Sequence, residues 1–192
     1  TAIGTEALRQ STTGSNNTAV GSASLILNTT GSNNVAHGYH ALFNNTTASE
    51  NTAVGYQAAY TNTTGASNSV FGWKALYSNT TGSKNVAFGL NAGFSNTTGT
   101  NNTFVGAPDS SGFGSGHYIT TGSKNTILGA YDGNQGGLDI RTSSNNIVLS
   151  DGDGNPRMWV YNGYSNFSNT TSWQSGGVGA HSLENTNPGQ DV

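Results

Sequence analysis

A single glycine recurs every 17 residues through the first half of this 192-residue chain, and this period limits the fold more than any other feature. The recurring residues are Gly4, Gly21, Gly38, Gly55, Gly72, Gly89 and Gly106. Asparagines and threonines around each glycine keep the same spacing. Such a period is typical of repeat architectures, in which each repeat is one structural unit stacked on the next.

Each repeat contains two short apolar stretches, for example 52–54 and 75–77, bounded by glycine on one side and Asn-Thr-Thr-Gly on the other. Both are too short for helices, and β-branched or aromatic residues between such turn formers are typical of strands. The repeat therefore predicts an all-β chain, a β-solenoid or parallel β-roll, with one coil per repeat. With neighbouring strands about 4.8 Å apart, six coils would form a rod roughly 30 Å long.

Two rows of residues precede the glycines. The row two residues before them is mostly small, as a thin coil interior requires: Ala19, Ala36, Ala53, Val70, Ala87 and Phe104. The row one residue before them is larger: Val20, His37, Val54, Phe71, Phe88 and Val105. Because successive strand residues point to opposite faces, a single coil cannot bury both rows. We therefore expect a homotrimer, intertwined or side by side, with the larger row as its core.

The repeat turn is expected to combine corner glycines with asparagines that tolerate left-handed backbone and stack in a hydrogen-bonded ladder. These residues are Gly21, Gly38, Gly55, Gly72, Gly89 and Gly106, with Asn34, Asn51, Asn68 and Asn85. An aromatic row is expected to line a coil corner: Phe43, Tyr60, Tyr77 and Phe94. Tyr39, Tyr56 and Trp73 form a shorter ladder, a pattern more typical of packing than of recognition.

The period fails after Gly106, which divides the chain into four parts. We expect a shaft of 17-residue coils at 1–106, a linker or inserted loop at 107–122, degenerate coils and a closing β segment at 123–161, and a polar tip or tail at 162–192. Terminal repeats are commonly atypical because they cover exposed strand edges, so a distal β cap is expected. Because Thr1 aligns inside a coil, the chain is interpreted as part of a longer fibre.

The segment Asn51-Thr52-Ala53-Val54-Gly55-Tyr56 and its sister segments resemble the head repeat of trimeric autotransporter adhesins, and still more the related repeats of bacteriophage tail fibres. The resemblance covers 1–106, with weaker echoes at 125–129 and 146–150. It implies a left-handed parallel β-roll, an obligate trimer and attachment to a surface. The 17-residue period is longer than that of the common adhesin repeat. The lack of a heptad stalk and a membrane anchor favours a viral fibre fragment over a whole adhesin.

This resemblance predicts a structural and adhesive fibre, not an enzyme, located on a virion tail fibre or another extracellular surface. Its expected partners are further copies of itself, other virion or fibre proteins, and a host cell-surface glycan or protein. The alternatives are a bacterial adhesin head, a solenoid that binds a regular lattice such as ice, and a purely structural segment. Adjacent threonines such as Thr63 and Thr64 would face opposite ways, which disfavours the flat array that a lattice needs.

Composition narrows the choice of partners. Charged residues make up 8% of the chain, and six scattered Lys and Arg give no footprint for phosphate backbones, so no nucleic acid is expected. Apolar runs are far shorter than a membrane helix requires, so no membrane insertion is expected. The chain has no Cys, which excludes disulfides and Cys-ligated metals.

Five aromatic residues within one window near the distal end are candidate glycan contacts, because aromatic rings stack on sugar rings. They are Trp159, Tyr161, Tyr164, Phe167 and Trp173. The alternative interpretation places Trp159 and Tyr161 in the core of the closing β structure.

Two weaker patterns suggest a metal. Asp151, Asp153 and Asn155 have the spacing of the first calcium ligands in an EF-hand, but Asn162 stands where that loop needs a bidentate Glu, and a tight turn explains the same residues. Three copies of His37 could converge on a trimer axis with His40 nearby, although a packed histidine fits that apolar row better. No other cofactor is expected. No His lies in a recognisable catalytic pattern, so no catalytic residue is assigned.

Overall fold

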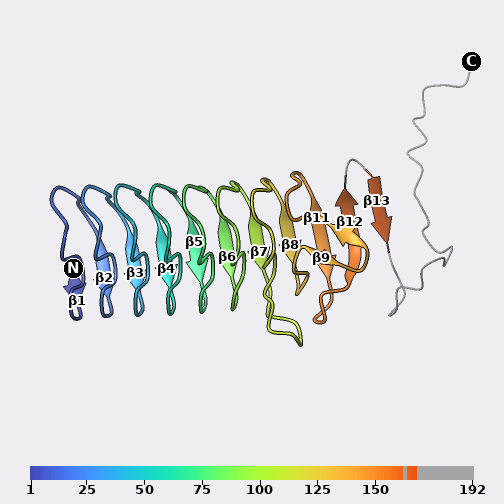
Figure 1. Cartoon of the computed structure of the whole chain (residues 1–192), viewed down its shortest axis with the longest axis horizontal. Coiled ribbons are helices and arrows are strands. Elements are labelled where there is room, and N and C mark those ends of the chain that lie inside the picture. The colour runs from blue at the N-terminus through green and yellow to red at the C-terminus, as the bar shows by residue number, and fades with distance from the viewer. Residues whose placement is uncertain (162–163, 168–192) are drawn as a thin grey trace, which may run out of the picture.

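A computed structural model of the chain is an all-β parallel solenoid (Figure 1). The structure describes residues 1–161 and 164–167, and it contains strands and turns but no helix in these ranges. Eleven strands form one sheet in the order β1 to β8, then β11, β12 and β13, while β9 and β10 form a separate two-stranded pair. The predicted fold class is therefore confirmed.

Nine parallel strands stack along the solenoid, one per coil. They are β1 (Ala2–Ile3), β2 (Thr18–Val20), β3 (Val35–His37), β4 (Thr52–Val54), β5 (Ser69–Phe71), β6 (Val86–Phe88), β7 (Thr103–Val105), β8 (Thr126–Leu128) and β11 (Ile147–Ser150). Their register follows the repeat, so Ala36 lies beside Ala53 and Ala53 beside Val70. Equivalent positions of the sequence thus become continuous rows along the rod.

The glycine period has a steric cause at the corner that follows each strand. Gly21 has a φ of +128°, and a Cβ there would lie 2.5 Å from the carbonyl oxygen of Gly38 in the next coil. Gly38 has a φ of +143°, and its Cβ would lie 2.3 Å from the carbonyl oxygen of Gly55. Both the left-handed backbone and the close approach of coils therefore require glycine.

The second apolar stretch of each repeat forms turns, not the strand that the sequence predicts. Leu25, Leu42 and Leu76 have φ values of +50°, +50° and +51°. Left-handed backbone costs a residue with a Cβ about 1–2 kcal/mol. Contacts between coils offset that cost: the Leu42 N–H donates to the carbonyl oxygen of Ala58 at 3.0 Å, and the Leu42 side chain is fully buried.

The core of each coil lies between this leucine row and the middle residue of the strand. The middle residues Ala19, Ala36, Ala53, Val70, Ala87, Phe104, Ile127 and Val148 are all fully buried. The interior is therefore thin and filled by small residues, as the sequence predicts.

Two ladders of buried asparagines run along the turns. In the first, the Asn51 N–H donates to Oδ1 of Asn34 at 3.0 Å, while Nδ2 of Asn51 donates to the carbonyl oxygen of Gly65 at 3.0 Å. The same pattern includes Asn17, Asn68, Asn85, Asn102, Asn125 and Asn146. The second ladder joins Nδ2 of one residue to Oδ1 of the previous one at 2.7–2.9 Å, through Asn28, Asn45, Asn62, Asn79 and Asn96. These side chains satisfy backbone groups that the turns would otherwise bury unpaired.

The segment 107–122 belongs to an enlarged coil between β7 and β8, where a loop projects from the rod (Figure 1). Asp109 organises the loop, since its Oδ1 accepts the N–H groups of Ser111 at 2.9 Å and Phe113 at 3.0 Å. The chain then rejoins the stack: the Gly93 N–H donates to the carbonyl oxygen of Ser115 at 2.8 Å. The insertion thus leaves the parallel stacking intact.

The last coil closes with antiparallel strands. It follows β9 (Asn134–Gln135) and β10 (Leu138–Asp139), and β11 pairs with β12 (Pro156–Tyr161), which pairs with β13 (Tyr164–Phe167). Trp159 pairs with Val148 of the buried row, and both Trp159 and Tyr161 pack against the core.

Candidate functional site

The outer face of the sheet carries a mostly apolar row along the solenoid. We define the outer face by the first and third strand residues, which lie on the opposite side from the buried middle residue. The first row is Thr18, Val35, Thr52, Ser69, Val86 and Thr103, and the third row is the predicted trimer core, Val20, His37, Val54, Phe71, Phe88 and Val105. None of these residues is buried, and Phe88 is 53% exposed. A single chain therefore leaves this row open to solvent.

Neighbouring side chains of the outer face contact one another but remain exposed to solvent. The rings of Phe71 and Phe88 stack with centroids 4.9 Å apart, and Val35 and Val86 are each 38% exposed. Ile147 extends the apolar surface onto β11 at 43% exposure. Continuous apolar surface of this kind marks interaction sites on soluble proteins.

A second exposed row adjoins the outer face, one residue beyond the corner glycine. This aromatic strip consists of Tyr39, Tyr56, Trp73 and Leu90, which are 46%, 42%, 44% and 38% exposed. The ring centroids of Tyr56 lie 5.4 Å from Tyr39 and 6.0 Å from Trp73, with interplanar angles of 11°. Sequence reasoning interprets these rings as packing residues, whereas the structure leaves almost half of each ring accessible. Because neighbouring rings stack on one another, their edges rather than their faces are offered to a partner.

The corner row forms a longer and more buried stack. Phe43, Tyr60, Tyr77, Phe94 and His117 follow one another with centroids 5.0–5.2 Å apart. His40 lies between the two aromatic rows, with its ring 3.8 Å from that of Tyr39. Burial lowers the pKa of both His40 and His117, and for His117 the nearby Asp132 and Asp109 oppose this shift only in part. Both shifts favour the neutral imidazole.

The distal candidates are only partly brought together. Trp159 and Tyr161 are half-buried and cover the end of the core. In the strand register Tyr164 lies beside Tyr161, and Phe167 beside Met158. Trp173 lies outside the described residues.

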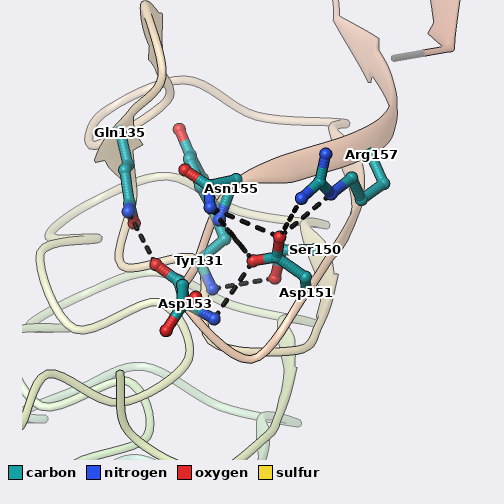
Figure 2. Close-up of polar contacts among 7 residues, drawn as sticks. All are labelled: Tyr131, Gln135, Ser150, Asp151, Asp153, Asn155 and Arg157. Carbon is teal, nitrogen blue, oxygen red and sulfur yellow. Dashed lines mark hydrogen bonds and ion pairs between the residues drawn. The ribbon is translucent and has the colours of Figure 1, made fainter. Parts of the chain in front are cut away.

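The predicted calcium loop is a turn organised by Asp151 (Figure 2). Its Oδ1 accepts the N–H groups of Asp153 at 3.1 Å and Asn155 at 2.9 Å, and its Oδ2 accepts Nε of Arg157 at 3.0 Å and is also bonded by Nη2. Burial alone would raise the pKa of Asp151, but the bonds from Arg157 and Asn155 outweigh it and the pKa is lowered. Both carboxylate oxygens are thus engaged, Oδ1 by backbone N–H groups and Oδ2 by the guanidinium of Arg157.

The turn is tied to the preceding coil (Figure 2). Nε2 of Gln135 donates to the carbonyl oxygen of Asp153 at 2.7 Å, and the Tyr131 N–H donates to Oγ of Ser150 at 2.9 Å. These bonds fix the start of the closing strands.

The two threonine rows of the turns differ in whether their hydroxyl groups are engaged within the coil. The Thr63 hydroxyl donates to the carbonyl oxygen of Thr80 at 2.9 Å, and its equivalents are similarly engaged. The following threonine is exposed in every coil: Thr13, Thr30, Thr47, Thr64, Thr81, Thr98, Thr121 and Thr142. One regular row of exposed hydroxyls therefore runs along the turns.

The described residues contain neither a metal-binding cluster nor a membrane-spanning helix. No three His, Asp or Glu side chains in residues 1–161 and 164–167 gather closely enough to hold a metal ion. No helix in this part of the chain is long and apolar enough to cross a membrane.

Comparison of the chain with protein-family models, with curated proteins and with solved structures finds no match. The architecture itself defines the class: a parallel β-solenoid of 17-residue coils.

Proposed function

We propose that the chain is a structural and adhesive fibre segment, a homotrimer whose outer sheet faces pack around a common axis. The observation that carries this proposal is the third row of the outer face, which is apolar except for His37 and is not buried in a single chain. Nine strands about 4.8 Å apart make that face roughly 40 Å long. Monomeric soluble proteins rarely expose an apolar patch of this extent, and two further copies of the chain would cover it.

The continuous contacts along the rod also suit a fibre. Parallel strands, two asparagine ladders and stacked rings continue from coil to coil, so each coil is held by its neighbours along the axis. A rigid trimeric rod holds three equivalent tips at a fixed distance from its base, which raises avidity without a strong individual site.

The finer identity rests on the resemblance of the repeat to bacteriophage tail fibres. We propose attachment to a host surface from a virion, with a glycan or protein receptor contacted at the distal aromatic residues Tyr164 and Trp173. Trp159 and Tyr161 pack against the core of the closing coil. An adhesin head on a bacterial surface is the alternative with the same assembly.

The solution mass measured by light scattering tests the assembly. We expect three times 19.7 kDa for the parent chain and a monomer for Phe88→Glu, which places a charge on the apolar row. A monodisperse parent monomer would overturn the trimer. Tyr164→Ala and Trp173→Ala should weaken cell attachment without changing the mass, and unchanged attachment would leave a purely structural segment.

The exposed threonine row favours a second candidate, a binder of a regular lattice such as ice. This candidate is weaker because the preceding threonine of each turn uses its hydroxyl in a hydrogen bond to the next coil. One row of free hydroxyls remains, which is not a flat array. Thermal hysteresis of the parent chain, lost in Thr64→Val/Thr81→Val, would support it, and no hysteresis would end it.

A further inference from the structure

We infer that each chain seats its aromatic strip against the first row of the outer face of the next copy, coil against coil. This inference rests on the proposed trimer and specifies which residues meet in it. It gives the strip Tyr39, Tyr56, Trp73 and Leu90 a partner, namely the row Val35, Thr52, Ser69 and Val86 of a neighbouring copy.

Symmetry requires two different patches on each chain. In a closed ring of three, one surface of a copy meets a different surface of the next, unlike a two-fold dimer in which one patch meets itself. The third row, nearest the proposed axis, is one continuous surface and supplies only the centre. The first row and the aromatic strip lie on either side of it, and both are exposed.

The composition of these surfaces matches that of protein interfaces. Neither the outer face nor the strip contains Asp, Glu, Lys or Arg, although Nζ of Lys74 lies over the Trp73 ring of the strip, 4.6 Å from its centroid. Tyr, Trp and Phe are enriched in interface cores, where charged residues are depleted. Ring edges that project from a stack suit a flat, β-branched row better than they suit a sugar ring, which needs an open aromatic face.

The residue volumes of the first row and the strip are complementary in two of the four coils, whereas Val35, as large as Val86, shares its coil with Tyr39. Ser69, the smallest residue of the first row, shares its coil with Trp73, the largest of the strip. Val86, which is larger, shares its coil with Leu90, the smallest of the strip. A three-fold rotation about an axis parallel to the rods shifts no copy along that axis. The partners of a residue therefore come from the same coil of the next copy.

The flat projection of the outer face and strip is smaller than the area that a stable interface buries. The strip lies four residues after the first row, at about 3.3 Å per residue. Multiplied by the length of the face, roughly 40 Å, this width gives the outer face and strip together a projected area of roughly 500 Å². Side-chain relief adds to this, and a stable interface buries about 800 Å² on each partner.

Chemical cross-linking tests the pairing, because the chain has no Cys and an introduced thiol is unique. Val86→Cys and Leu90→Cys are made on separate chains that carry different tags, co-expressed, and treated with a short bis-maleimide. Both side chains are 38% exposed, and neither belongs to a ring stack. We expect a covalent pair containing one chain of each kind.

The matched control combines Val86→Cys with Tyr56→Cys, a strip residue two coils away and therefore roughly 10 Å along the rod. We expect loss of the mixed pair. An equal yield from the control, or Leu90→Cys chains linked to each other, would overturn the pairing. Thermal unfolding of each single variant confirms that it folds.

Trp73→Ala gives a second measurement, with expected loss of the trimer mass and retention of the β-sheet circular dichroism of the parent. A parent monomer would overturn the proposed function and this inference together. A parent trimer without the mixed pair, or a Trp73→Ala trimer as stable as the parent, would overturn this inference alone.

Discussion

The ring of Phe104 fills the space above Gly93 that a leucine takes in other coils. A Cβ built on Gly93 would lie 2.5 Å from Cδ2 of Phe104, and a Cβ on Gly116 would lie 2.4 Å from Cδ1. Other coils place Leu25, Leu42 or Leu76 at the position of Gly93. The volume of the coil interior is therefore kept, but the large side chain comes from the strand instead of from the turn.

This exchange predicts strong coupling between the two positions. Gly93→Leu alone should destabilise the chain by about 1–3 kcal/mol through overpacking, and Phe104→Ala alone by about 3–5 kcal/mol through a cavity. The double variant recreates the leucine-and-small pair of other coils and should lose clearly less than the sum. Urea unfolding of all four chains measures the coupling, and additive losses would contradict the volume exchange.

The second asparagine ladder predicts a large effect at a residue that the sequence does not single out. Nδ2 of Asn62 donates to Oδ1 of Asn45 and to the carbonyl oxygen of Gly65, both at 2.9 Å, and its Oδ1 accepts from Asn79 at 2.7 Å. Asn62→Ala leaves these buried partners unpaired, at about 1–3 kcal/mol for each group. Its matched control is Thr64→Ala in the same turn, which is exposed. Similar unfolding midpoints for the two variants would count against the ladder.

The sequence is sufficient for features that each coil requires locally. The corner glycines and the small middle row repeat because the same clash and the same thin interior recur, so period and alternation predict Gly38 and Ala36 correctly. The Asn-Thr-Thr-Gly turn is ambiguous, since its residues suit an exposed loop as well as a buried ladder. Only stacking against the next coil buries Asn62.

Other features depend on partners that are distant in sequence. Leu42 adopts left-handed backbone that its residue type disfavours, because hydrogen bonds from the neighbouring coil hold it there. The pattern therefore suggests a strand where turns occur. Tyr56 and Tyr60 both recur with the period, and only the path of the corner leaves the first more exposed than the second.

The ion pair at the distal turn predicts the behaviour of the calcium candidate. Arg157→Ala should destabilise the closing strands by about 1 kcal/mol, because the pair with Asp151 is partly shielded from water. Arg141→Ala, which removes the more exposed pair with Asp139, is the matched control and should have a smaller effect. Thermal unfolding of each variant measures both.

The same guanidinium would compete with a bound cation at Asp151. We expect millimolar calcium or EDTA to leave the unfolding temperature of the parent chain unchanged. A calcium-dependent rise in the parent that Asp153→Ala abolishes would instead establish a calcium site in this turn.

Histidine burial predicts that stability falls in mildly acidic solution. The pKa of His117 in the folded chain lies below its usual value near 6.5, so the unfolded chain binds the proton more readily. The contribution of the neutral imidazole is complete above pH 6.5 and is lost as the pH falls from there toward the folded pKa. The carboxyl pKa values of Asp139 and Asp151 are also lowered, so those groups act only below their usual range near 3.8.

The variant His117→Phe separates the titration from the packing. A phenyl ring retains the stack on Phe94, whose centroid lies 5.0 Å from that of His117, but it takes up no proton. The unfolding temperature of His117→Phe should therefore fall less than that of the parent between pH 7 and pH 5. The pKa of His40 is also lowered by burial, so His40→Phe/His117→Phe should fall still less than His117→Phe. An equal fall in the parent and the double variant would assign the acid sensitivity to other groups.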